Sequence, residues 1–256
     1  MRTRVGMAVV LLGLLAACTL GGKAHVNVLA AASLQDVLTE LISHYEAAHP
    51  DVDVVPAFDA TSTLRTQIEE GAPADVFLAA DTASPKALAD AGLAGTPVHF
   101  AGNVVTLIVP KTNPAHIQSW IDLLTPGVAI IAAGETVPIT KYAEQTIANL
   151  AGLPDAPENA AATLDAAVAS REENVRSVLT KLELGQGDAA FVYLTDATSS
   201  TEVTQVVLPD GAAATATYDG AAVNGSSRGQ AFLDWLRTDE AQAVFADYGF
   251  TPPPGP

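Results

Sequence analysis

Hydroxyl side chains follow the first two predicted strands of the chain, where each strand gives way to a helix. Ser33 ends the segment "AAAS" (30–33), and Thr61 and Ser62 lie in "FDATSTL" (58–64). Short hydroxyl groups and the unpaired N–H groups of a helix's first turn both donate hydrogen bonds, and the positive end of the helix dipole lies beside them. Two such junctions predict a binding site for a small anion that needs no cationic side chain.

The same hydroxyl groups have a simpler interpretation as helix caps. Asp36, three residues after Ser33, gives a pattern like a capping box. Thr61, Ser62 or Thr63 could each cap the helix that follows the second strand. Capping and ligand binding do not exclude each other, because the remaining N–H groups of the first turn still point outward. The residues alone leave both interpretations open.

The elements that must position these residues alternate in type. Strand patterns at residues 25–31, 52–58 and 74–80 are each followed by a helical pattern. A second series has strand patterns at 103–110, 128–134, 189–194, 204–209 and 214–223, with helical patterns at 139–150 and 175–184. A pair of helical patterns within 226–250 follows. This order predicts an α/β fold of two lobes, each a mostly parallel sheet flanked by helices. In such folds ligands bind at the carboxyl ends of the strands.

The N-terminal residues predict export. Residues 1–17 have two arginines, an apolar run and then small residues, which is the order of a secretory signal peptide. The run ends in "LAAC" (15–18), which resembles a bacterial lipobox and implies a lipid on Cys18, with residues 18–24 as a tether. Cys18 is the single cysteine, so no disulfide can form within the chain.

The charge excludes one class of partner. The chain has 12 Lys and Arg against 29 Asp and Glu, a formal net charge of −17. Such a surface repels nucleic acid and anionic lipid headgroups. The five histidines show no metal-ligand spacing, and neither G-x-S-x-G nor a phosphate-binding glycine loop is present in the sequence.

Six segments together resemble the molybdate-binding proteins of bacterial ABC importers, over about residues 26–253. They are "AAASL" (30–34), "STLRTQIEEGAPADVFLAAD" (62–81), "NVVTLIVP" (103–110), "VPITKYAEQTI" (137–147), "ENVRSVLTKLELGQGDAAFVY" (173–193) and the closing "AQAVFADYGFTPP". The second and fifth segments carry most of the specificity, whereas the first is shared with sulfate and iron relatives.

The resemblance implies a type 2 periplasmic binding fold with a two-segment hinge. Lobe 1 would comprise residues 25–103 and 220–256, and lobe 2 residues 104–219. It also implies that molybdate or tungstate is held between the lobes by hydrogen bonds, without a cofactor and without a direct metal ligand. The implied donors are the hydroxyl and N–H groups of Ser33 and Thr61, the N–H groups of Ile139 and Val175, and the Tyr193 hydroxyl. Because molybdate is a fully deprotonated dianion near neutral pH, every partner should be a donor.

Asp59 departs from this family pattern, as do Thr61 and Ile139. A carboxylate that faced the ligand would repel a dianion by about 4 kcal/mol at 4 Å, with an effective dielectric constant near 20. Asp59 could instead accept hydrogen bonds from the hydroxyls of residues 61–63, or turn outward. It could also accept a proton carried by the ligand, or be protonated itself and donate. Asp59 and Ser62 are therefore candidates for the edge of the site.

These observations predict a lipid-anchored, extracytoplasmic solute-binding protein that delivers molybdate to an ABC permease and has no enzymatic activity. We expect a monomer whose lobes close over the ligand. A receptor for another tetrahedral oxyanion, sulfate or phosphate, is the first alternative. An exported hydrolase is a more remote one, because no serine has a histidine or acid at a recognisable spacing.

Overall fold

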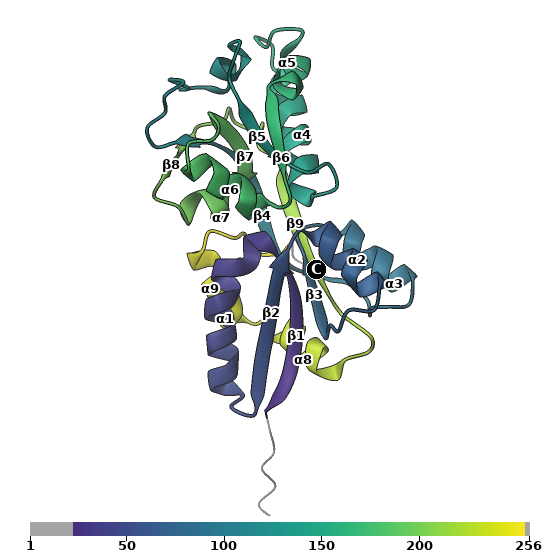
Figure 1. Cartoon of the computed structure of the whole chain (residues 1–256). Helices are drawn as coiled ribbons and strands as arrows, with labels where there is room; N and C mark the ends of the chain where they lie inside the picture. The colour runs from purple at the N-terminus through teal and green to yellow at the C-terminus, as the bar shows by residue number, and fades with distance from the viewer. Residues whose placement is uncertain (1–22, 254–256) are drawn as a thin grey trace, which may run out of the picture.

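The computed structural model describes residues 23–253 and shows two lobes joined by two long strands (Figure 1). One path of paired strands runs through both lobes, in the order β2-β1-β3-β9-β4-β7-β5-β6, with β8 paired to β4. The predicted two-lobed α/β fold is confirmed.

Lobe 1 is built from a three-strand parallel core and the helices that cover it. Its strands are β1 (Ala24–Ala31), β2 (Val52–Asp59) and β3 (Val76–Ala79). Its helical elements are η1 (Ala32–Leu34), α1 (Gln35–Ala48), α2 (Thr61–Glu69), α3 (Ala83–Asp90), α8 (Ser227–Trp235) and α9 (Asp239–Asp247). One face of α1, formed by Val37, Leu38, Leu41, Ile42 and Tyr45, is buried. The last two helices return to lobe 1, as the sequence suggested.

Lobe 2 repeats this plan. Its parallel strands are β5 (Ile130–Ala133), β6 (Val168–Glu172) and β7 (Ala189–Tyr193). Its other elements are η2 (Trp120–Leu124), α4 (Pro138–Ala151), α5 (Ala160–Ala166), α6 (Val175–Glu183), α7 (Leu194–Thr198) and β8 (Val203–Val206). The sequence pattern predicts none of η2, α5, β6 and α7. The three helical elements are short, and β6 alternates without large apolar residues.

Strands β4 (Val98–Pro110) and β9 (Thr215–Ala222) connect the lobes. β4 pairs with β9 up to Val104 and with β7 from Val105 onward. All antiparallel pairs among the named strands involve β4 or β9, so the sheet is mixed, although β1–β3 and β5–β7 each form a parallel set. The expected lobe boundaries at 103/104 and 219/220 fall within these two strands, and their exact positions stay a prediction.

At the start of α3 the Asp81 carboxylate accepts hydrogen bonds from the Ser84 N–H at 2.6 Å and from its hydroxyl at 3.1 Å. One local expectation differs from the structure. Ala24, expected in the tether, begins β1. The signal peptide expected at 1–17 and the lipid site expected at Cys18 lie outside the described residues. Within residues 23–253, no helix is both long enough and apolar enough to span a membrane.

Gly229 allows α8 to pack closely on lobe 1. A Cβ atom added there would lie 1.9 Å from the backbone oxygen of Asp75. We expect Gly229→Ala to lower the free energy of unfolding by about 1–3 kcal/mol in urea denaturation, because this overlap outweighs the roughly 1 kcal/mol helix preference for alanine.

Gly152→Ala is the matched control, because its added Cβ would meet no atom closer than 3.4 Å. It should leave the free energy of unfolding nearly unchanged. Equal stability of both variants would show that α8 does not need this contact.

Candidate ligand-binding cavity

The lobes enclose a small cavity at the carboxyl ends of β1 and β2. It contains about 210 Å³ of empty space, part of which is open to solvent. Its lining is Ala31, Ala32, Ser33, Asp59, Ala60, Thr61, Ala80, Val137, Pro138, Ile139, Asn174, Val175 and Tyr193. The structure thus brings together all five residues predicted to bind the ligand. Their contact with a ligand stays a prediction.

Helix N-termini from both lobes meet at this cavity. Thr61 is the first residue of α2, Ile139 the second of α4 and Val175 the first of α6, while Ser33 lies in η1 just before α1. First-turn N–H groups have no acceptor within their own helix. The backbone bonds among residues 23–253 give these four N–H groups no other acceptor. The cavity is therefore bordered by free donors and by the positive ends of helix dipoles.

The Ser33 hydroxyl is not a helix cap, and the capping interpretation is wrong. Its Oγ lies 2.8 Å from the hydroxyl oxygen of Tyr218, and Asn103 Nδ2 donates to that same oxygen at 3.4 Å. Asn103 Oδ1 accepts from the Val104 N–H, which fixes the orientation of the amide. Burial raises the pKa of Tyr218, so its hydroxyl keeps its proton and can either donate to Ser33 or accept from it. When Tyr218 donates, the Ser33 proton is left for a ligand.

Thr61 is oriented in the same way by a different partner. Its side chain is buried, and its Oγ1 accepts a hydrogen bond from the Ala80 N–H at 3.0 Å. Because the oxygen is already an acceptor, its own proton is free to point into the cavity. The cap of α2 is Ala60, with no side-chain hydrogen bond, so Thr61, Ser62 and Thr63 do not cap this helix.

Tyr193 presents a buried hydroxyl without a partner. The residue is 1% exposed, and its hydroxyl oxygen makes no hydrogen bond within the described part of the chain. Leaving such a group unpaired costs about 1–3 kcal/mol, so it calls for an explanation. Burial, with Tyr218 and Tyr142 nearby, raises the pKa of Tyr193 well above its usual value. The group therefore stays protonated and is a donor at the cavity wall.

Asp59 lines the cavity but does not orient the hydroxyls. Its Oδ1 accepts from the Ala60 N–H at 2.7 Å and from Asn174 Nδ2 of lobe 2 at 3.4 Å. The expected bonds from residues 61–63 are not among those of the described residues. Ser62 lies outside the cavity lining, and its hydroxyl accepts from Thr136 of lobe 2 at 3.4 Å. A protonated Asp59 stays a prediction.

Sequence reasoning missed three residues that support the site. Asn174 caps α6 by accepting from the Ser177 N–H at 3.0 Å, and an asparagine before a helical pattern is a signal that could have identified it. Tyr218 and Asn103 carry no such signal, because they reach Ser33 only through pairing of distant segments.

Comparison with known proteins places this geometry in a family. A family described as bacterial extracellular solute-binding protein matches residues 26–251. The chain belongs to this family of solute-binding proteins. It is 34% identical to the molybdate-binding protein ModA of Mycobacterium tuberculosis, over 91% of this chain and 86% of that protein. This supports the resemblance seen in the sequence.

Two further proteins extend the comparison. A putative ABC transporter substrate-binding lipoprotein of Bacillus subtilis, YvgL, is 31% identical, over 90% of this chain and 87% of the relative. The solved structure of the sulfate-binding protein SubI of M. tuberculosis has a TM-score of 0.76 at 24% identity, covering 89% of this chain and 86% of the other. The latter likeness shows the fold of this solute-binding protein.

The hydrogen bond from Ala80 to Thr61 gives a stability prediction. Thr61→Val should lower the free energy of unfolding by about 1–3 kcal/mol in urea denaturation of the ligand-free protein, because the buried Ala80 N–H loses its acceptor. Thr61→Ser keeps the acceptor and should cost less than about 1 kcal/mol. A valine variant as stable as the serine variant would mean that Ala80 finds another partner.

Proposed function

We propose that this protein binds molybdate in the interlobe cavity by hydrogen bonds alone. The observation that carries the proposal is the buried, unpartnered Tyr193 hydroxyl at a wall of donors. A fully deprotonated tetrahedral dianion offers only acceptors, and it would satisfy the hydroxyls of Ser33, Thr61 and Tyr193 together with first-turn N–H groups from both lobes. The molybdate-binding relative supports the choice of anion. Tungstate has the same shape and charge and should bind as well.

We further propose that the protein acts outside the cytoplasm as a lipoprotein that delivers its ligand to an ABC permease. The family description and the relative named a lipoprotein support this, together with the lipobox-like sequence ending at Cys18. We expect a monomer that needs no cofactor and catalyses no reaction. Binding in a cavity shared by two lobes gives a permease a closed shape to recognise.

Sulfate is the alternative with a specific observation behind it, because a sulfate-binding protein shares the fold. Fixed donors select among tetrahedral anions by cavity radius. The test is a thermal shift series with molybdate, tungstate, sulfate and phosphate on the mature domain. A free ligand concentration of 100 Kd adds about 2.7 kcal/mol, which corresponds to roughly 5–10 °C for a chain of this size. A shift with sulfate and none with molybdate would overturn the proposal.

Tyr193→Phe separates ligand binding from folding. We expect calorimetric affinity for molybdate to fall by about 1.5–3 kcal/mol, the range for a hydrogen bond to a charged group. The free energy of unfolding without ligand should stay the same or rise, because the removed hydroxyl has no partner within the described residues. Tyr248→Phe, on the surface of lobe 1, is the matched control and should leave affinity unchanged. Undiminished affinity of the Tyr193 variant would exclude the hydroxyl from the site.

Asp59→Asn tests the carboxylate in the cavity lining. Asparagine keeps an oxygen to accept from the Ala60 N–H but removes the charge. At pH 8 the variant should bind molybdate more tightly than the parent, because repulsion of the dianion is removed. If Asp59 takes up a proton with the ligand, the parent should bind more tightly as pH falls toward 5, and the variant should lose most of this dependence. Identical affinities of both proteins at pH 5 and pH 8 would show that the carboxylate has no part in binding.

A further inference from the structure

Apart from bonds made by the connecting strands β4 and β9, three polar contacts among residues 23–253 join the lobes near the cavity. Arg176 Nη2 of α6 donates to Asp36 Oδ2 of α1 at 2.6 Å. The other two are the longer contacts between Asn174 and Asp59 and between Thr136 and Ser62, each at 3.4 Å. The first contact is the shortest of the three and joins opposite charges.

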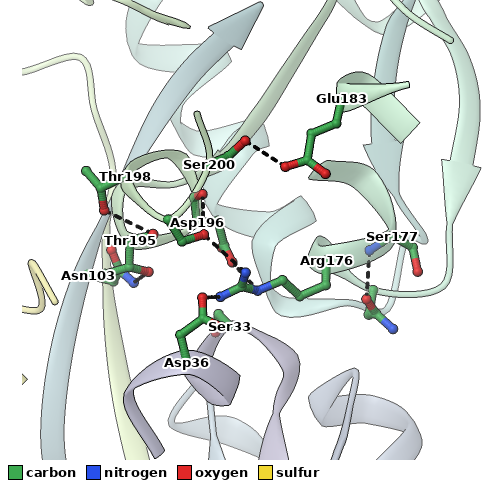
Figure 2. A network of polar contacts seen from close by, with 12 residues as sticks. Ser33, Asp36, Asn103, Arg176, Ser177, Glu183, Thr195, Asp196, Thr198 and Ser200 are labelled. Atoms are coloured by element: carbon green, nitrogen blue, oxygen red, sulfur yellow. Dashed lines mark hydrogen bonds and ion pairs between the residues drawn. The ribbon is translucent and has the colours of Figure 1, made fainter. Parts of the chain in front are cut away.

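Lobe 2 holds Arg176 in place independently of lobe 1. Its Nε lies 3.0 Å from Oδ1 of Asp196, as an ion pair without hydrogen-bond geometry, and its Nη1 donates to Ser199 Oγ at 3.1 Å. Asp196 is fully buried, so an ionised carboxylate at this position depends on the guanidinium. Figure 2 shows Arg176 reaching from α6 between Asp196 and Asp36. Contacts within lobe 2 therefore hold the Arg176 guanidinium without help from Asp36.

The position of the pair couples it to the cavity. Asp36 lies three residues after Ser33, and Arg176 directly follows Val175. Neither Asp36 nor Arg176 lines the cavity, so this ion pair is not a ligand contact. It connects the two first turns that supply donors from opposite lobes. Because its two side chains belong to different lobes, the bond is lost when the lobes separate.

We propose that Arg176 and Asp36 form an interlobe latch that holds the closed state and slows ligand release. The proposal rests on the proposed function for its ligand, but the latch is a property of the two lobes. The side chains of Arg176 and Asp36 are 22% and 40% exposed, so solvent weakens their attraction and the latch can open at each transport cycle. Arg176 and Asp36 are positioning residues.

Asp36→Asn is the decisive variant, because it removes the negative charge of the lobe 1 partner, which weakens the bond to Arg176, and leaves the pair of Arg176 with Asp196 intact. We expect molybdate to dissociate about 3–10-fold faster in stopped-flow measurements, with a matching rise in Kd. Loss of a negative charge by itself would act in the opposite direction and tighten the binding of an anion. The control is Asp90→Asn, which removes an exposed carboxylate paired with Lys86 within α3. It should not speed dissociation. An Asp36→Asn variant that binds as tightly as this control would overturn the proposal.

A cycle of combined variants tests whether Asp36 acts through Arg176. Arg176→Gln alone would leave Asp196 buried without its cation, so it is combined with Asp196→Asn. In that background Asp36→Asn should change the dissociation rate less than 1.5-fold, since no latch remains to be broken. An undiminished effect of Asp36→Asn would show that it acts without Arg176.

An interlobe distance provides a readout that needs no ligand. Spin labels at cysteines replacing exposed Ser43 in lobe 1 and Glu158 in lobe 2, with Cys18→Ser, report the separation of the lobes. Without ligand, Asp36→Asn should shift the distance distribution toward longer values, and Asp90→Asn should not. Failure of the parent protein to bind molybdate would overturn the proposed function while leaving this test in force. Identical distributions for parent and Asp36→Asn would overturn the latch.

Discussion

The cavity depends on one constraint: hydroxyl groups must present protons, and not lone pairs, to an anion. A hydroxyl can do either, so its oxygen has to be occupied by another donor first. The Ala80 N–H meets this requirement for Thr61. For Ser33 the hydroxyl of Tyr218, which itself accepts from Asn103, can meet it by donating. The strand order explains why this is possible, because β9 carries Tyr218 between β3 and β4. For Thr61 the framework thus fixes the direction of the proton, and for Ser33 it places a hydroxyl beside the oxygen that can do the same.

In an acidic protein that binds an anion, the attraction of nearby donors must exceed the repulsion by distant acidic side chains. The net charge of −17 is spread over the chain, and salt screens exposed charges beyond about 8 Å at physiological ionic strength. The donors at the helix N-termini act within a few ångströms of the ligand, where solvent is largely excluded. Each helix terminus contributes about 0.3–1 kcal/mol and each hydrogen bond to a charged group about 1.5–3 kcal/mol. Local donors therefore outweigh distant acids, whereas Asp59 in the cavity lining is close enough to matter.

Much of this fold could be predicted from local sequence patterns, and the site only in part. The strand-to-helix junctions at Ser33 and Thr61 follow from hydrophobic periodicity and hydroxyl placement over a few residues. Ile139, Val175 and Tyr193 came from family resemblance, because a backbone N–H donor leaves no mark in its side chain. Tyr218 lies 115 positions from Asn103 and 185 positions from Ser33 in the sequence. Their roles depend on the fold bringing these three residues together. Such pairing is set by the assembled sheet and is not encoded by any local pattern.

The arrangement of the donors around the cavity bears on how the protein can release a ligand. A site built entirely within one lobe would keep its donors in place, and release would depend on thermal escape alone. Here the donors come from α2 and η1 on one side and from α4, α6 and β7 on the other, so separation of the lobes breaks the set in two. Each half keeps its own internal bonds, as Thr61 keeps Ala80 and Arg176 keeps Asp196. Opening therefore costs only the bonds that cross between the lobes, together with those to the ligand. Strands β4 and β9 join the lobes through continuous backbone, which allows the halves to part and meet again in the same register.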